Sequence, residues 1–148
     1  MKKAITYFMA LTLVLGSIGT SSIISLAKEK ENLSKESYAE GSLEVMPYGA
    51  YLRAGTSSIN KTGTGKIYAK GVTLGEGTVS KLSVSVRVER LLGNAWVQQD
   101  YFAATKYNAN NVAASKTLTV PIGYFYRVKS IHGANTDSSS SWTEGLYI

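Results

Sequence analysis

Cysteine is absent from this chain of 148 residues. Its absence excludes disulfide bonds, a thiolate nucleophile, a lipid-modified cysteine and any zinc site built on thiolates. A domain of this length is large enough to fold on a hydrophobic core alone. We therefore expect stability to come from packing rather than from covalent or metal cross-links.

Histidine is almost absent as well, because His132 is the only one. A zinc site needs three or four suitable ligands, and a serine nucleophile needs a base beside it. His132 could pair with a serine and with Asp137, but no Gly-x-Ser-x-Gly sequence accompanies it. We predict a hydrogen-bonded histidine at a strand end, no enzymatic activity and no cofactor.

Carboxylates are few, with ten Asp and Glu in the whole chain. Glycoside hydrolysis needs two of them facing one cleft. Glu89 and Asp100 are expected to face each other on the wet side of a hairpin, where pairing with Arg87 or Arg90 explains them without catalysis. A calcium site formed by the oxygens of Asn135, Asp137 and Glu144 is the alternative for the last loop.

Long apolar runs are limited to the N-terminus. Lys2 and Lys3 precede an apolar segment over 4–15, and the small residues Ser25 and Ala27 end the region. This order is typical of a secretory signal peptide, so we predict a signal peptide over 1–27 and an extracellular protein. An uncleaved anchor is the alternative. No later segment is long enough to span a bilayer once the signal is removed.

Charge divides the rest of the chain into two parts. Residues 28–41 are polar, with alternating Lys and Glu, and we predict a flexible leader over 28–47; a short helix or a pro-segment also fits residues 28–41. Residues 41–148 hold 11 Lys and Arg against six Asp and Glu. This excess attracts anionic surfaces, so we expect an anionic partner for the domain over 48–148.

Alternation of apolar and polar residues is the clearest structural signal. Leu82, Val84, Val86 and Val88 alternate with polar residues and predict a strand with one buried face. A Gly-Asn turn at 93–94 then predicts a β-hairpin with 95–103. A strong signal predicts a strand at 124–131. Weaker signals predict further strands at 50–60, 66–74, 115–120 and 142–148, with a serine loop at 138–141.

About seven strands predict an all-β fold, as an antiparallel two-sheet sandwich of immunoglobulin-like type. Tyr126 follows a glycine turn and lies two residues before Val128. This spacing resembles the tyrosine corner of such sandwiches, in which the hydroxyl group bonds to an upstream backbone group. A tyrosine-rich strand without that role, an up-and-down barrel and a jelly roll are the alternatives.

Several strand and turn motifs also occur together in one known family. They are Pro47–Leu52, Ser58-Ile59, Gly63–Ile67, Val88–Leu91, Asn94–Val97, Gly123–Val128 and His132. Over about residues 45–148 the chain resembles a group of small secreted proteins from Gram-positive bacteria that share a domain of unknown function. The resemblance implies export and an all-β domain, and it carries no catalytic or binding residue.

These features predict a secreted, non-enzymatic binding or structural protein that acts at or outside the cell surface. Aromatic rings stack on sugars and basic groups attract phosphate or carboxylate, so we predict contacts through Arg87, Lys129 and Trp142. The expected partner is an anionic cell-wall polymer, a polysaccharide or a protein, and not a nucleic acid. A secreted antimicrobial or toxin-like protein is the alternative. Nothing in the sequence indicates the oligomeric state.

Overall fold

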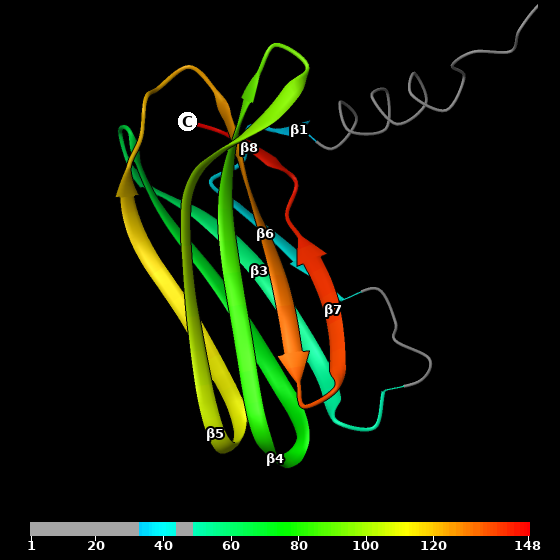
Figure 1. The fold of residues 1–148 in the computed structure, drawn as a ribbon. Helices are drawn as coiled ribbons and strands as arrows, with labels where there is room; N and C mark the ends of the chain where they lie inside the picture. Colours follow the sequence, from blue (N-terminus) through cyan, green and yellow to red (C-terminus); the bar gives the residue numbers. More distant parts are fainter. Residues whose placement is uncertain (1–32, 44–48) are drawn as a thin grey trace, which may run out of the picture.

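The computed structural model of the protein describes residues 33–43 and 49–148. These residues form eight strands and no helix (Figure 1). The strands are β1 (Leu33–Ser34), β2 (Tyr38–Ser42), β3 (Leu52–Gly63), β4 (Lys66–Leu92), β5 (Ala95–Thr119), β6 (Phe125–Ala134), β7 (Asp137–Trp142) and β8 (Gly145–Tyr147). The predicted all-β class is confirmed. The predicted signal peptide over 1–27, with its helix, lies outside the described residues.

All eight strands belong to one hydrogen-bonded sheet. Its order is β1-β8-β6-β4-β3-β2, with β5 beside β4 and β7 beside β6. Every pairing is antiparallel except that of β1 with β8. The sheet folds over on itself, so that β3 packs against β6 and β7 without pairing with them and the barrel is nearly closed. Two separate sheets with immunoglobulin-like connections are not confirmed.

The reason for a single sheet is the length of β4 and β5. The β4 strand bends at Gly75 and Gly77, where its pairing with β5 skips from Leu74 to Val79, and Gly77 has a φ of +133°. Beyond the bend it continues in the opposite layer with the same partner. The sequence predicts two separate strands here, at 66–74 and 82–88, with these glycines between them, whereas the structure has one. Glycine at this point allows a bend without ending the ladder.

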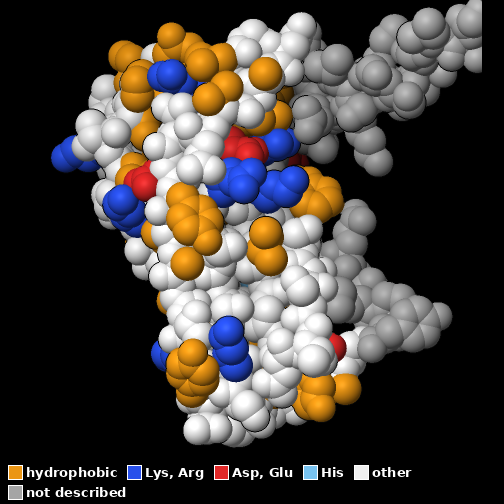
Figure 2. Space-filling view, in the orientation of Figure 1, with side chains coloured by type: hydrophobic (Ala, Val, Ile, Leu, Met, Phe, Trp, Pro, Cys, Tyr) orange, Lys and Arg blue, Asp and Glu red, His pale blue; other side chains and the backbone are white. Residues whose placement is uncertain are grey.

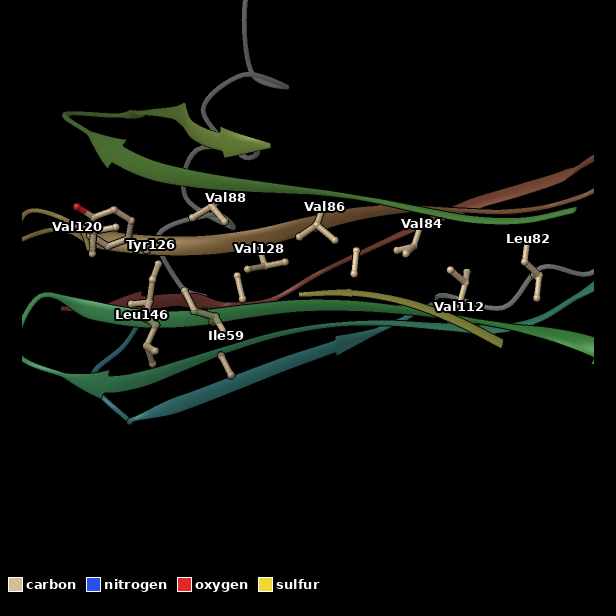
Figure 3. Close-up of a cluster of buried hydrophobic side chains, with 14 of the residues drawn as sticks. Ile59, Leu82, Val84, Val86, Val88, Val112, Val120, Tyr126, Val128 and Leu146 are labelled. Carbon is tan, nitrogen blue, oxygen red and sulfur yellow. The ribbon is translucent and has the colours of Figure 1, made fainter. Parts of the chain in front are cut away.

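The inner face of the two layers forms the hydrophobic core (Figure 3). Leu82, Val84, Val86 and Val88 are fully buried, as their alternation predicts. Ile59 of β3 is buried in the facing layer. Burying each such aliphatic side chain stabilises the fold by about 1.5–3 kcal/mol.

The predicted β-hairpin is confirmed. Leu92 pairs with Ala95 across a turn in which Gly93 has a φ of +61°. A β-bulge follows, because Glu89 pairs with Gln98 whereas Val88 pairs with Asp100. The extra residue, Gln99, shifts the register of the rest of β5 by one position.

The prediction of a flexible leader is wrong for its described residues. Leu33–Ser34 and Tyr38–Ser42 are strands, and β2 pairs with β3 along its whole length. A sheet edge offers backbone partners to a polar segment, provided that the inward side chains are small. In β2 these residues are Ala39, which is buried, and Gly41, whose missing side chain leaves room for the backbone of Trp142. The β domain therefore includes residues before Tyr48.

The serine loop predicted at 138–141 is also wrong. These residues lie in β7, which pairs with β6 from Ala134↔Asp137 to Lys129↔Trp142. The turn between the two strands places Asn135 at a φ of +49°, a conformation that asparagine tolerates. Ser141 is fully buried, so its hydroxyl group has a role inside the molecule.

The hydroxyl group of Tyr126 donates a hydrogen bond of 2.7 Å to the carbonyl oxygen of Pro121, as the tyrosine-corner spacing predicts. Tyr126 is fully buried, and burial raises the pKa of its hydroxyl group. Tyr126→Phe is therefore expected to lower the free energy of unfolding by about 1 kcal/mol in urea denaturation. The control Tyr124→Phe changes a more exposed ring and should leave stability unchanged. Equal stability of the two variants would show that the hydroxyl bond contributes nothing.

Candidate functional site

The three predicted contact residues lie side by side on the outer face of the sheet. Arg87 of β4 pairs with Lys129 of β6, and Lys129 pairs with Trp142 of β7. On the other side of Arg87 is Tyr101 of β5. We call Tyr101, Arg87, Lys129 and Trp142 the basic-aromatic row. Neighbouring strands are about 4.8 Å apart, so four strands place its ends about 14 Å apart.

The row faces solvent because of strand alternation. Arg87 lies between the buried Val86 and Val88, and Lys129 lies between the buried Val128 and Ser130. Tyr101 and Trp142 are 53% and 44% exposed. Figure 2 shows basic side chains gathered on this face beside hydrophobic ones. The row therefore presents two cations between two aromatic rings.

Ion pairs and ring contacts fix the positions of these cations. The Lys129 ammonium group lies 5.9 Å from the centre of the Trp142 ring, within the range of a cation–π contact. Glu89 accepts a hydrogen bond of 2.7 Å from Arg127 and lies 3.6 Å from the Arg87 guanidinium. Arg127 in turn stacks 4.3 Å from the Trp96 ring. Glu89 is nearly buried and lies two residues from Arg87 on the same face of β4, so it pairs with the guanidinium groups of both Arg87 and Arg127.

The expected facing of Glu89 and Asp100 is wrong. The bulge at Gln99 places Asp100 beside Val88, whose side chain points inward, whereas Glu89 points to the outer side with Arg127. Asp100 binds Lys116 at 2.7 Å, and this hydrogen bond lowers the pKa of its carboxyl group. Of the two expected partners, Arg87 does lie near Glu89. The two carboxylates therefore do not share a cleft.

His132 lies within β6, inside the molecule, in a chain of hydrogen bonds. Its Nδ1 is 2.8 Å from Thr73 Oγ1, and its Nε2 is 2.8 Å from Ser141 Oγ. Ser57 Oγ lies 2.7 Å from both Ser141 Oγ and Ser130 Oγ. We call these five side chains the buried serine–histidine network. All five residues are fully buried.

The contact between His132 and Ser141 resembles a base beside a nucleophile, but its burial leaves no route for a substrate to either atom. Burial lowers the pKa of His132 to about 4, so the ring is neutral at physiological pH. The network joins β3, β4, β6 and β7. Its geometry suits a structural role between the two layers.

Asp137 and Asn135, two of the three residues considered for calcium, have backbone partners instead. Asp137 Oδ2 accepts hydrogen bonds from the backbone nitrogens of Tyr51 and Leu52, at 2.6 and 3.0 Å. Asn135 Oδ1 accepts one from Lys81 at 3.0 Å. Among residues 33–43 and 49–148, no three His, Asp or Glu side chains are grouped as a metal site would require. The loop oxygens thus tie the β6–β7 turn to β3 and β4.

The sequence matches no family model and no curated protein sequence. The resemblance to small secreted proteins of Gram-positive bacteria therefore stays a prediction. Within the part of the chain that the structure describes, no helix has the length and apolar character needed to cross a bilayer.

Sequence reasoning missed Tyr101 as a member of the row. If the two strands of the hairpin are paired residue by residue from the Gly-Asn turn without a bulge, Arg87 lies opposite Asp100. The extra residue at Gln99 shifts this register by one position and brings Tyr101 beside Arg87. Trp142 and Tyr107, which lie among polar residues in the sequence, are both exposed.

Proposed function

We propose that this protein is secreted and binds an anionic polysaccharide or cell-wall polymer through the basic-aromatic row, without catalysis. The observation that carries the proposal is the row itself, in which Arg87 and Lys129 lie between the exposed rings of Tyr101 and Trp142. Aromatic rings pack on the apolar faces of sugars, and the cations attract phosphate or carboxylate groups.

The shape of the surface favours an extended ligand. The row crosses four strands of a sheet, and a sheet surface can contact several successive units of a polymer. The hollow at the bend of β4 and β5 is a shallow pocket of about 170 Å³ lined by Arg53, Leu74, Gly75, Gly77, Asn110 and Asn111. Sites for small molecules are usually larger and more enclosed, so the pocket is the weaker candidate.

Export of the protein is part of the proposal. It is supported by the basic, apolar and small-residue order of 1–27, which predicts removal of this segment.

A sandwich-like architecture is also part of the proposal. One face of each layer is covered by the other layer, and the opposite face remains available for binding. The Tyr126 hydroxyl bond supports an immunoglobulin-like relationship.

The double variant Arg87→Gln/Lys129→Gln is expected to bind purified cell wall at least about tenfold more weakly at low salt, because it removes both cations of the row. The salt dependence of the remaining binding should also be smaller. Trp142→Ala should weaken binding while leaving the salt dependence unchanged, because it removes a ring and no charge. Co-sedimentation with wall fragments over a salt series measures both quantities.

Arg53→Gln/Lys61→Gln is the matched control, because it removes the same charge from exposed positions of β3. A general effect of net charge predicts equal losses from the two double variants and would contradict the proposed site. Wall from which the phosphate-containing polymer has been extracted serves as the ligand control. Retention of the unmodified protein on neither wall preparation would reject the proposed function.

A further inference from the structure

The outer edge of β5 is the longest unpaired strand edge on the described part of the molecule. The strand runs from Ala95 to Thr119 and pairs only with β4. Unpaired backbone groups along a strand edge are a template for another strand, and proteins that remain monomeric usually protect such edges with charges, bulges or a covering loop. The unpaired edge of β5 therefore needs either protection of this kind or a partner strand.

One stretch of β5 is regular and has no charge on its outer face. Pairing with β4 is uninterrupted from Asp100 to Tyr107, between the bulge at Gln99 and the left-handed Asn108 with a φ of +48°. The side chains of this stretch on the outer face are Tyr101, Ala103, Thr105 and Tyr107. Edge protection by outward charges is thus missing from this stretch.

The same stretch is complementary to itself about Ala104. If a second copy lies antiparallel with Ala104 opposite Ala104, then Tyr101 faces Tyr107 of the copy and Ala103 faces Thr105. Aromatic pairs directly across two strands are favourable. Tyr101 and Tyr107 are 53% and 68% exposed in the single chain, so each has an uncovered ring to contribute.

The inward side chains fit this register as well. Half-buried Phe102 would face Lys106 of the copy, whose aliphatic stem can cover the ring while its ammonium group reaches water. Asp100 would face the uncharged Asn108. No pair of like charges is brought together directly across the two strands, which removes the commonest penalty for such pairing.

We propose that the protein forms a two-fold symmetric dimer through antiparallel pairing of residues 101–107 of β5. The occupant of the edge is a second copy of this chain, because the complementarity is of the segment with itself. The sheets of the two copies then join into one continuous sheet. This proposal does not depend on which ligand the protein binds.

A consequence for binding rests on the proposed function. Tyr107 lies beside Lys81 of β4, so the dimer would place Tyr107 and then Lys81 of the second copy next to Tyr101. The basic-aromatic row of each copy would gain an aromatic residue and a cation. A longer polymer could then be held by both copies at once.

Cross-linking tests the register directly, because the chain has no cysteine of its own. Residues opposite each other in an antiparallel pair have Cα atoms about 4.5–5.5 Å apart, which suits a disulfide. Ala104→Cys in the full mature chain is expected to form a disulfide-linked dimer under mild oxidation. Ala103→Cys and Thr105→Cys should cross-link when mixed, and much more slowly when each is alone.

Ala113→Cys is the control, since it is exposed on the same strand but outside the proposed pairing. Sedimentation of the unmodified protein should show a dimer, and Tyr107→Lys should shift it toward monomer. Monomer at all concentrations would overturn the proposal, and so would a dimer in which Ala104→Cys cross-links no faster than Ala113→Cys. Wall binding is measured separately, so a dimer without wall binding would reject the proposed function and leave the pairing intact.

Discussion

Gly55→Ala is expected to lower the free energy of unfolding by about 3 kcal/mol. An alanine Cβ at this position of β3 would lie 2.7 Å or less from three atoms of the His132 ring. Real Cβ atoms do not approach so closely, so the ring or the strand must move. The ring is held on both sides by Thr73 and Ser141, and moving it weakens buried hydrogen bonds as well as packing.

Gly63→Ala is the matched control for this effect. Gly63 lies in the same strand, and its added Cβ would meet only the Lys66 side chain, at 3.9 Å. Urea denaturation of the two variants separates the steric clash from the general effect of replacing glycine in a strand. Equal losses in the two variants would mean that the contact between Gly55 and His132 is unimportant for stability.

Acid is expected to destabilise the protein by about 3 kcal/mol between pH 6.5 and pH 4 through His132 alone. The unfolded chain binds a proton at the ordinary histidine pKa of 6.5, whereas burial lowers the pKa in the folded protein to about 4. Between these values the unfolded state binds more protons, so falling pH favours unfolding. Below about pH 4 both states are protonated, and this residue adds no further loss.

Denaturant titrations at a series of pH values measure this loss. The upper half of the window is specific, because His132 is the only histidine and unperturbed carboxyl groups titrate mainly below it. His132→Gln removes the titration, so its stability should change little from pH 6.5 to 5.5 even if the variant is less stable throughout. The same slope in both proteins would contradict a buried neutral His132.

Strand signals in the sequence predicted the core well, because side-chain alternation depends on local geometry. Val84, Val86 and Val88 could be assigned to the interior from their spacing alone. The hairpin turn at Gly93 followed from its residue types for the same reason. Arg87, Lys129 and Trp142 could be chosen individually by their chemistry, but their alignment required the register of four strands.

The features that the sequence did not predict depend on distant partners. Tyr38–Ser42 has no apolar pattern and becomes a strand because the edge of β3 supplies hydrogen-bond partners. Ser138–Ser141 is a low-complexity run of serines, which predicts a loop, but Ser141 contacts His132 and Ser57 inside the molecule. Long-range pairing overrides local preference in both segments.

Strands β4 and β5 pass through both layers, and this affects how the protein unfolds. A sandwich of two separate sheets has a seam of side chains along which the sheets can part. Here the ladder between β4 and β5 is present on both sides of the bend, so parting the layers also strains backbone hydrogen bonds. We therefore expect the two halves to unfold together as one cooperative unit.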